Sequence, residues 1–273
     1  MPDLFAPSGP SYADVRTPDV MHALRPSTSS RLSVVAPTRP PQVVELVGPA
    51  GAGKTTLRHA LAALEPRAHT AVRIDRRREF DVVMHAALQL LVPVLAGTVG
   101  RRGAPSWGDA VQLVRLRALR PAVDRLVANS GQLVLLDEGP VYALAKLEAY
   151  SRAARDAGAF GALWRDALAR WRTSLDVVVW LDAPDELLVH RIRARAKAHR
   201  VKTTATLEAA CFLSRYREAY GTVVKRLCTP GGPRLLRIDT ASGTPAEQAV
   251  RLTAALEALQ PRAGVSSPPC RAD

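Results

Sequence analysis

The chain has 273 residues, 47% of them hydrophobic, which is enough to close the core of one α/β domain. Lysine and arginine outnumber aspartate and glutamate by 38 to 25, so the formal net charge is +13 and would attract polyanions. Since 33 of the 38 basic residues are arginine and only 5% of all residues are aromatic, the charge follows composition rather than a base-stacking surface, and we expect no direct nucleic-acid binding.

Both ends of the chain are rich in proline and show no helical or strand period. We therefore expect residues 1–41 and 261–273 to be disordered tails and residues 42–260 to form one folded domain. The amino terminus has no basic region followed by an apolar run, which predicts no signal peptide. The three cysteines lie far apart and outside any metal-binding spacing, which is typical of a reduced, cytoplasmic protein.

Five apolar runs, separated by helical patterns, predict the strands of a sheet. Parallel neighbours need crossover helices, so this alternation predicts a parallel sheet with helices on both faces. The fold class is therefore α/β, with a five-stranded parallel sheet between two helical layers. In chain order the runs are residues 43–47, 71–74, 133–136, 177–181 and 235–238.

The segment between the second and third runs, residues 78–131, is predicted to hold two helices with a turn near residues 103–108. Its most apolar part, residues 82–99, has almost the length of a membrane span. That part contains His85 and Pro93, however, so we expect a buried helix and no membrane segment.

The sequence GPAGAGKTT, residues 48–56, matches the motif GxxxxGK[ST] between a predicted strand and a predicted helix. Its glycines allow backbone N–H groups to face the phosphates of a nucleotide at the positive end of the helix. We expect Lys54 to reach the β- and γ-oxygens and the hydroxyl of Thr55 to bind Mg²⁺. A glycine turn with a surface lysine is the alternative. The predicted nucleotide-binding residues are Gly48, Ala50, Gly51, Ala52, Gly53, Lys54, Thr55 and Thr56.

A second motif, LVLLDEGP, ends a predicted strand in two acids. The carboxyl ends of parallel strands face the ligand crevice in such folds. We expect Asp137 to bind Mg²⁺ directly or through water, and Glu138 to orient or deprotonate the attacking group. The alternative is that one carboxylate, Glu138 above all, only caps the following helix.

A third feature is a basic segment, residues 191–202, which contains no acid. Its like charges repel one another unless an anion lies among them, and the planar fork of arginine suits phosphate oxygens. Arg191 and Arg195 are one helical turn apart, so we expect both to contact the same ligand. A solvated basic helix is the alternative. The six basic residues are Arg191, Arg193, Arg195, Lys197, Arg200 and Lys202.

Together these segments resemble the thymidylate kinase and deoxynucleoside kinase group of P-loop kinases over residues 43–256. In that group the P-loop strand is followed by an acceptor-contacting segment, a strand ending in an acid, and a strand that leads into an arginine-rich lid. Residues 74–77, Asp137 and residues 181–184 occupy these places here. The resemblance implies a P-loop NTPase fold in which the basic segment is the lid.

One residue departs from the pattern of the group. Glu138 stands where the group commonly has an arginine that helps to place the acceptor. A glutamate there is similar to the catalytic carboxylate of P-loop ATPases. The usual acceptor signature is also missing near Ile74, although Asp75, Arg76 and Arg77 are available to a polar or anionic substrate.

The resemblance implies an ATP-dependent phosphotransferase that moves the γ-phosphoryl group to a small-molecule acceptor, a nucleoside or nucleoside monophosphate, with Mg²⁺ and ATP. The catalytic residues implied are Lys54, Asp137, Glu138, Arg191 and Arg195. The Asp-Glu pair keeps open a P-loop ATPase that couples hydrolysis to a protein partner, and a nucleotide-binding regulator without transfer activity is a third hypothesis. The sequence leaves a homodimer open.

Overall fold

The structure is a computed structural model that describes residues 42–64, 68–71, 84, 87, 106–129, 133–151, 159–196 and 198–259. The tails predicted at residues 1–41 and 261–273 lie outside the described residues. The same is true of most of the apolar stretch at residues 82–99. Of the described helices, none is both long enough and apolar enough to cross a membrane.

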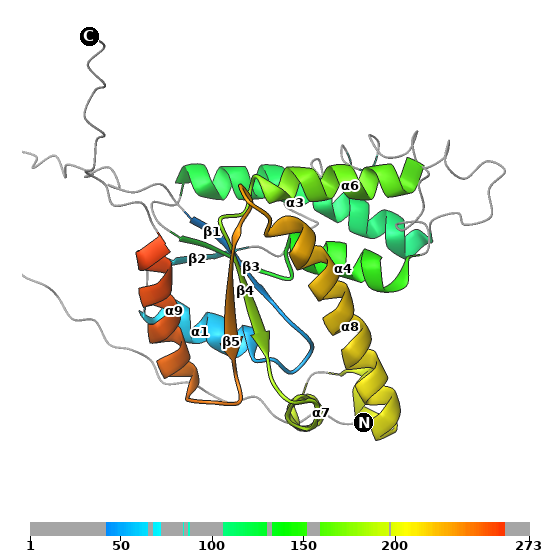
Figure 1. The fold of residues 1–273 in the computed structure, drawn as a ribbon, viewed down its shortest axis with the longest axis vertical. Helices are drawn as coiled ribbons and strands as arrows, with labels where there is room; N and C mark the ends of the chain where they lie inside the picture. Colours follow the sequence, from blue (N-terminus) through cyan, green and yellow to red (C-terminus); the bar gives the residue numbers. More distant parts are fainter. Residues whose placement is uncertain are drawn as a thin grey trace, which may run out of the picture. The chain divides into compact units, whose positions relative to one another are not determined.

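Five parallel strands form one sheet, in the spatial order β2-β3-β1-β4-β5 (Figure 1). The predicted parallel α/β sheet is therefore confirmed. Four of the five strands begin and end within one residue of the apolar runs that predicted them. The strands are β1 (Gln42–Val47), β2 (Ala68–Ala71), β3 (Leu133–Asp137), β4 (Val177–Asp182) and β5 (Arg234–Asp239).

The second strand was predicted three residues too late. The prediction followed the apolar run at residues 71–74, but β2 pairs Ala68 with Leu133 and ends with Ala71 opposite Leu136. The strand lies at the edge of the sheet and pairs with β3 alone, so it does not need the continuous apolar character of a central strand. Residues 72–74 lie outside the described part of the chain.

Helices cover both faces of the sheet (Figure 1), with α1 and α9 on one face and α3, α4, α6 and α8 on the other. The three-layer arrangement is thus present. Of the two helices predicted for residues 78–131, the second corresponds to α3, which begins at Trp107, inside the expected turn, whereas most of the first lies outside the described residues. The helices are α1 (Lys54–Leu64), α3 (Trp107–Asn129), α4 (Pro140–Tyr150), α6 (Ala159–Arg172), α7 (Asp185–Ala194), α8 (Thr206–Leu227) and α9 (Pro245–Leu259), with a 3₁₀ turn η1 (Arg200–Lys202).

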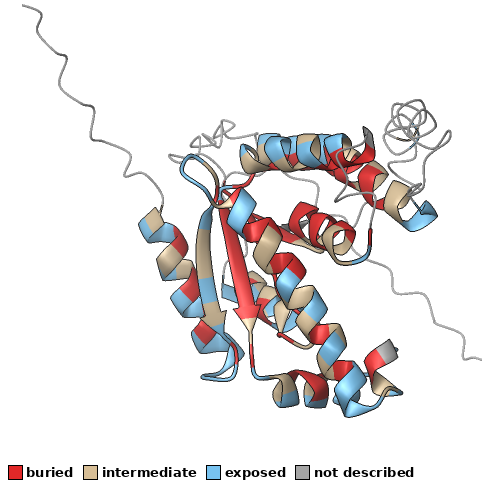
Figure 2. Cartoon of the chain, turned by 45° about the vertical axis from the view of Figure 1, so that its right-hand side comes forward, coloured by how far each residue is buried: buried red, intermediate tan, exposed pale blue. Residues whose placement is uncertain are grey.

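The core has two parts because side chains alternate along each strand. In β1, Val43 and Val47 pack among α3, α4, α6 and α8, whereas Val44 and Leu46 pack among α1, α7 and α9. All six residues of β1 are buried, while β5 at the sheet edge is intermediate or exposed along its length (Figure 2). The central position of β1 places the glycine turn that follows it at the middle of the carboxyl edge of the sheet.

Candidate active site

The turn between β1 and α1 needs glycine at three positions. Gly48, Gly51 and Gly53 have φ values of 139°, 83° and 83°, in the region that disfavours residues with a Cβ atom. A Cβ on Gly48 would overlap the carbonyl oxygen of Leu181, and one on Gly51 would lie 2.6 Å from the carbonyl oxygen of Leu188. The turn therefore lies directly against the end of β4 and against α7.

Lys54, the first residue of α1, folds its side chain back over this turn. Its ammonium group donates hydrogen bonds to the carbonyl oxygens of Gly48 at 2.7 Å and Pro49 at 2.8 Å. Burial lowers the pKa of Lys54 to about 8, although the charges of Asp137 and Glu138 act to raise it. The ammonium group is thus close to both acids that the sequence predicted, while Thr55 and Thr56 on the same helical turn are exposed.

Asp137 ends β3, beside β1 in the sheet. It is opposite Leu46 in the parallel register, and its Oδ2 lies 3.6 Å from Nε of Arg58 in α1. Both side chains are about a quarter exposed, at 25% and 27%. Arg58 was not predicted as a site residue, although its position four residues after Lys54 places both side chains on one face of α1.

Glu138 has a φ of 56°, and no other non-glycine residue in the described part of the chain has a positive φ. Arg115 of α3 donates a hydrogen bond to its carbonyl oxygen and lies 3.9 Å from its carboxylate. The Glu138 side chain is 42% exposed, and the guanidinium of Arg115 also lies over the ring of Tyr142, 5.5 Å from its centre. Positive φ in a residue with a side chain costs free energy and is common at functional sites.

The helix after this turn, α4, is capped by Glu45 and not by Glu138. The backbone N–H groups of Val141 and Tyr142 donate to the Glu45 carboxyl oxygens at 2.8 Å and 3.0 Å. The hypothesis that Glu138 caps α4 is therefore wrong, because α4 draws its acceptor from β1, a distant part of the chain. Sequence reasoning missed Glu45, although an acid within the apolar run VVELV was a visible signal.

The two arginines chosen from the basic segment have different surroundings. Arg195 follows α7, and its charge contributes to lowering the pKa of Lys54. Arg191 instead donates hydrogen bonds to the side-chain oxygen of Thr240 at 3.0 Å and to its carbonyl oxygen at 2.7 Å. The charge of Arg195 thus acts on Lys54, whereas the guanidinium of Arg191 is bound to Thr240.

The basic segment is not one helix. α7 ends at Ala194, Arg195 and Ala196 lie in a bend, and the short η1 turn closes the segment. Lys202 donates a hydrogen bond to the carbonyl oxygen of Arg195, and Arg193 donates to the carbonyl oxygen of Thr204 at 3.2 Å. The interpretation as a continuous solvated helix is therefore wrong. Lys197 and the side chain of Arg200 lie outside the described residues.

Arg217 of α8 joins the ends of two elements near the glycine turn. It donates to both carboxylate oxygens of Asp182 at 2.9 Å and 3.1 Å and to Asp185 at 2.8 Å. Its hydrogen bonds with Asp182, and then those with Asp185, raise the pKa of Arg217 despite partial burial. The network fixes the start of α7, which the glycine turn contacts.

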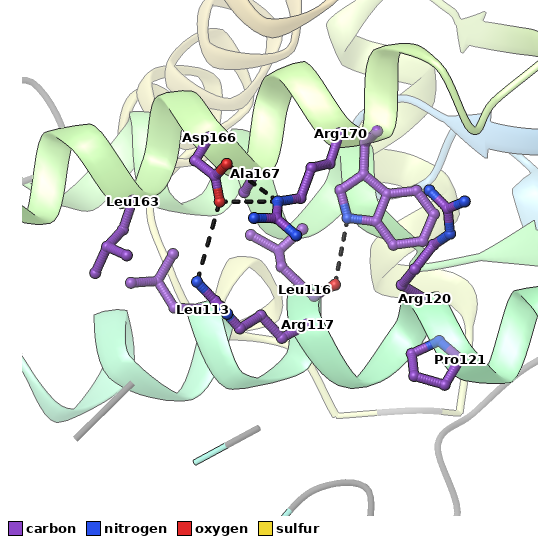
Figure 3. Close-up of a pocket in the computed structure, with 10 residues that line it drawn as sticks. Leu113, Leu116, Arg117, Arg120, Pro121, Leu163, Asp166, Ala167 and Arg170 are labelled. Carbon is purple, nitrogen blue, oxygen red and sulfur yellow. Dashed lines mark hydrogen bonds and ion pairs between the residues drawn. The ribbon is translucent and has the colours of Figure 1, made fainter. Parts of the chain in front are cut away.

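A separate hollow of about 180 Å³ lies between α3 and α6 (Figure 3) and shares no residue with the glycine turn. Arg117 and Arg170 both reach Asp166, and the indole N–H of Trp171 donates to the carbonyl oxygen of Leu116 at 3.3 Å. Because Arg117 and Arg170 pair with Asp166, and Arg120 pairs with Asp124, the hollow fits a gap in helix packing better than a ligand site.

A family model described as AAA domain matches residues 43–218. No curated protein matches the chain. Solved structures similar to the chain include thymidylate kinase from Candida albicans, with a TM-score of 0.50 and 12% identity over 81% of this chain and 92% of that one. Deoxyadenosine kinase from M. mycoides has a TM-score of 0.46 and 11% identity over 80% of this chain and 100% of that one. Shikimate kinase from Acinetobacter baumannii has a TM-score of 0.41 and 18% identity over 80% of this chain and 94% of that one.

At these identities the solved structures bear on the fold alone. The family match covers well over half of the chain and includes the glycine turn, the two acids after β3 and the basic segment. The chain therefore belongs to the AAA domain family and has the parallel α/β fold of P-loop kinases.

Proposed function

We propose that the chain is an ATP-dependent kinase that transfers the γ-phosphoryl group to a small-molecule acceptor of the nucleoside or nucleoside monophosphate class. One observation carries the proposal: Lys54 follows a glycine turn at the carboxyl edge of a parallel sheet, and the charges of Asp137, Glu138 and Arg195 all act on its ammonium group. Two cations and two acids at that place suit a reaction that moves a charged group between two oxygen atoms.

ATP binding would use the glycine turn and the start of α1. Gly48 and Gly51 carry no Cβ atom that would block the turn, and backbone N–H groups at the helix amino terminus would line a phosphate cradle. In binding, Lys54 would exchange its two carbonyl partners for phosphate oxygens, which are stronger acceptors for an ammonium group. Arg195 would add a second cation, since its charge already acts on Lys54.

The residues present fit Mg²⁺, because Thr55 and Asp137 offer oxygen donors near the cradle and magnesium needs only one or two protein oxygens besides phosphate. Among the described residues, no group of three metal-ligating side chains is found. A magnesium site completed by phosphate oxygens does not need such a group. When bound, the ion would neutralise phosphate charge. Arg58 holds Asp137 in place at 3.6 Å.

The acceptor would be oriented by Glu138. Its carboxylate is partly exposed, next to Arg115 and close to Lys54, so it is accessible to a hydroxyl or phosphate group. With a nucleoside as acceptor, its hydroxyl oxygen bonds to the γ-phosphorus, the bond to the ADP oxygen breaks, and a carboxylate oxygen of Glu138 would receive the hydroxyl proton. A nucleoside monophosphate attacks through an ionised phosphate oxygen that has no proton to lose, so Glu138 would then only help to orient it.

The test is ADP release from MgATP by the purified chain, with and without a panel of nucleosides and nucleoside monophosphates. Lys54→Ala should lower acceptor-dependent turnover by about a hundredfold or more, because it removes charge stabilisation from the transferred group. Lys225→Ala, which removes an exposed lysine in the last turn of α8, should match the wild type. Equal turnover by the Lys54 variant, or ADP release that no acceptor increases, would contradict the proposal.

A further inference from the structure

Glu45 places a carboxyl group in the middle of the central strand. It has no solvent exposure, and it points to the same face of the sheet as Val43 and Val47, which belong to the hydrophobic core. Burying a polar group costs free energy unless hydrogen bonds compensate for the lost water. An apolar residue would pack there without that cost, so we ask which hydrogen bonds offset the cost of burying the Glu45 carboxyl group.

Two hydrogen bonds of the Glu45 carboxyl group lie at the start of α4. Its Oε2 and Oε1 atoms accept the N–H groups of Val141 and Tyr142, so the two oxygens satisfy two donors that no helical carbonyl can reach. The residue that precedes α4, Gly139, provides no side-chain cap. A Cβ on Gly139 would lie 2.9 Å from Cδ of Glu45, so the glycine allows the close approach.

Only two residues separate the end of β3 from the start of α4. They are Glu138, with its positive φ, and Gly139. Arg115 holds the carbonyl oxygen of Glu138 from α3, while Glu45 holds the start of α4 from β1. The backbone of Glu138 is therefore fixed on both sides, and a shift of α4 would redirect its carboxylate.

We infer that Glu45 is a positioning residue of the proposed phosphoryl transfer, which orients Glu138 by capping α4 from within the sheet. The inference rests on the proposed function. Glu45 itself touches no reacting atom; it acts through the turn that carries Glu138. A cap that serves stability alone would leave catalysis unchanged when it is weakened, provided that the chain stays folded.

The test compares Glu45→Gln with Val43→Ala. The glutamine keeps the size of the side chain but directs an N–H group at one of the two backbone donors, so one hydrogen bond is lost. The control variant removes buried apolar atoms from the same face of the same strand and leaves the α4 cap intact. For each variant, kcat and the KM for ATP are measured below the unfolding temperature, together with hydrogen exchange at the amides of Val141 and Tyr142.

We expect Glu45→Gln to lower kcat by about tenfold or more with the KM for ATP within about twofold of wild type, and to speed exchange at both amides. Val43→Ala should keep kcat within about twofold. If Glu45→Gln does not fold, Gly139→Ala disturbs the same contact from the other side and should show the same loss of kcat.

Two results would overturn the inference. One is wild-type kcat in a folded Glu45→Gln or Gly139→Ala variant, and the other is an equal loss of kcat in Val43→Ala. In both results the wild type is active, so the proposed function stands and only the role of Glu45 is lost. A wild type without acceptor-dependent turnover would instead overturn the proposed function, and the inference with it.

Discussion

The buried carboxyl group of Glu45 should make folding stability depend on pH. Burial raises the pKa of Glu45 from 4.5 to about 8, while hydrogen bonds from Val141 and Tyr142 and the charge of Arg115 act in the opposite direction. Because the pKa is higher in the folded state, the folded chain binds more protons than the unfolded chain between these two values. The stability associated with Glu45 is therefore fully present below about pH 4.5 and is lost as the pH rises through about 8.

The size of the effect follows from the difference between the two pKa values. A change from 4.5 to about 8 corresponds to at most about 5 kcal/mol, at about 1.4 kcal/mol for each pKa unit. The free energy of unfolding falls gradually, by about 1.4 kcal/mol per pH unit, over the range where Glu45 is protonated in the folded chain and ionised in the unfolded chain. Between pH 5 and pH 8 it amounts to about 3 kcal/mol.

Glutamine at position 45 does not titrate, so the matched comparison is the wild type against Glu45→Gln. Urea unfolding of both at several pH values between 5 and 8 gives the free energy of unfolding, and the difference between the two chains removes the other titrating groups. We expect the advantage of the wild type to fall by about 3 kcal/mol over this range. A difference that stays constant would show that Glu45 is ionised throughout, and that the α4 hydrogen bonds outweigh its burial.

Two further predictions concern the glycine turn and the ion pairs formed by arginine. Gly48→Ala should abolish MgATP binding, measured by isothermal titration, because its Cβ overlaps a backbone carbonyl group. Gly53→Ala should lower the affinity for MgATP only about tenfold, because its Cβ meets no atom and only backbone strain remains. Equal affinities of the two variants would contradict this prediction. Arg217→Ala should lower the free energy of unfolding by about 1–2 kcal/mol, because the Arg217 side chain is only 30% exposed and binds two acids. Arg170→Ala should lower it by at most about 0.5 kcal/mol, because the Arg170 side chain is 66% exposed and its partner is an i,i+4 acid on the same helix. Urea unfolding at pH 7 distinguishes the two, and equal losses would refute the difference.

The parts of the fold that the sequence predicted are those specified locally. The turn at residues 48–53 contains three closely spaced glycines, and Asp137 directly follows an apolar run, so both are visible in a short stretch of chain. The second strand was placed too late because β2 is an edge strand, for which apolar content is a weak guide. Its register comes from pairing with β3, about sixty residues away in the sequence.

The contacts that hold the site were not predicted, because each joins distant segments. Glu45 lies 96 residues before Val141, and Arg115 lies 23 residues before Glu138. Such a pair has no spacing rule in the sequence, unlike two residues on one helical face. Arg191 shows the converse: its helical spacing from Arg195 suggested a shared ligand, but Thr240, 49 residues later, supplies acceptors for its guanidinium.

The arginines of the site change how the Asp-Glu pair is interpreted. Each acid has an arginine from a different helix: Arg58 of α1 lies beside Asp137, and Arg115 of α3 lies beside Glu138. Glu138 stands where the resembled kinases commonly have an arginine, yet Arg115 brings a guanidinium to the same turn from elsewhere in the chain. The turn therefore retains a cation next to the acid. An acceptor with an anionic group would meet positive charge there, which supports phosphoryl transfer over simple activation of water by Glu138.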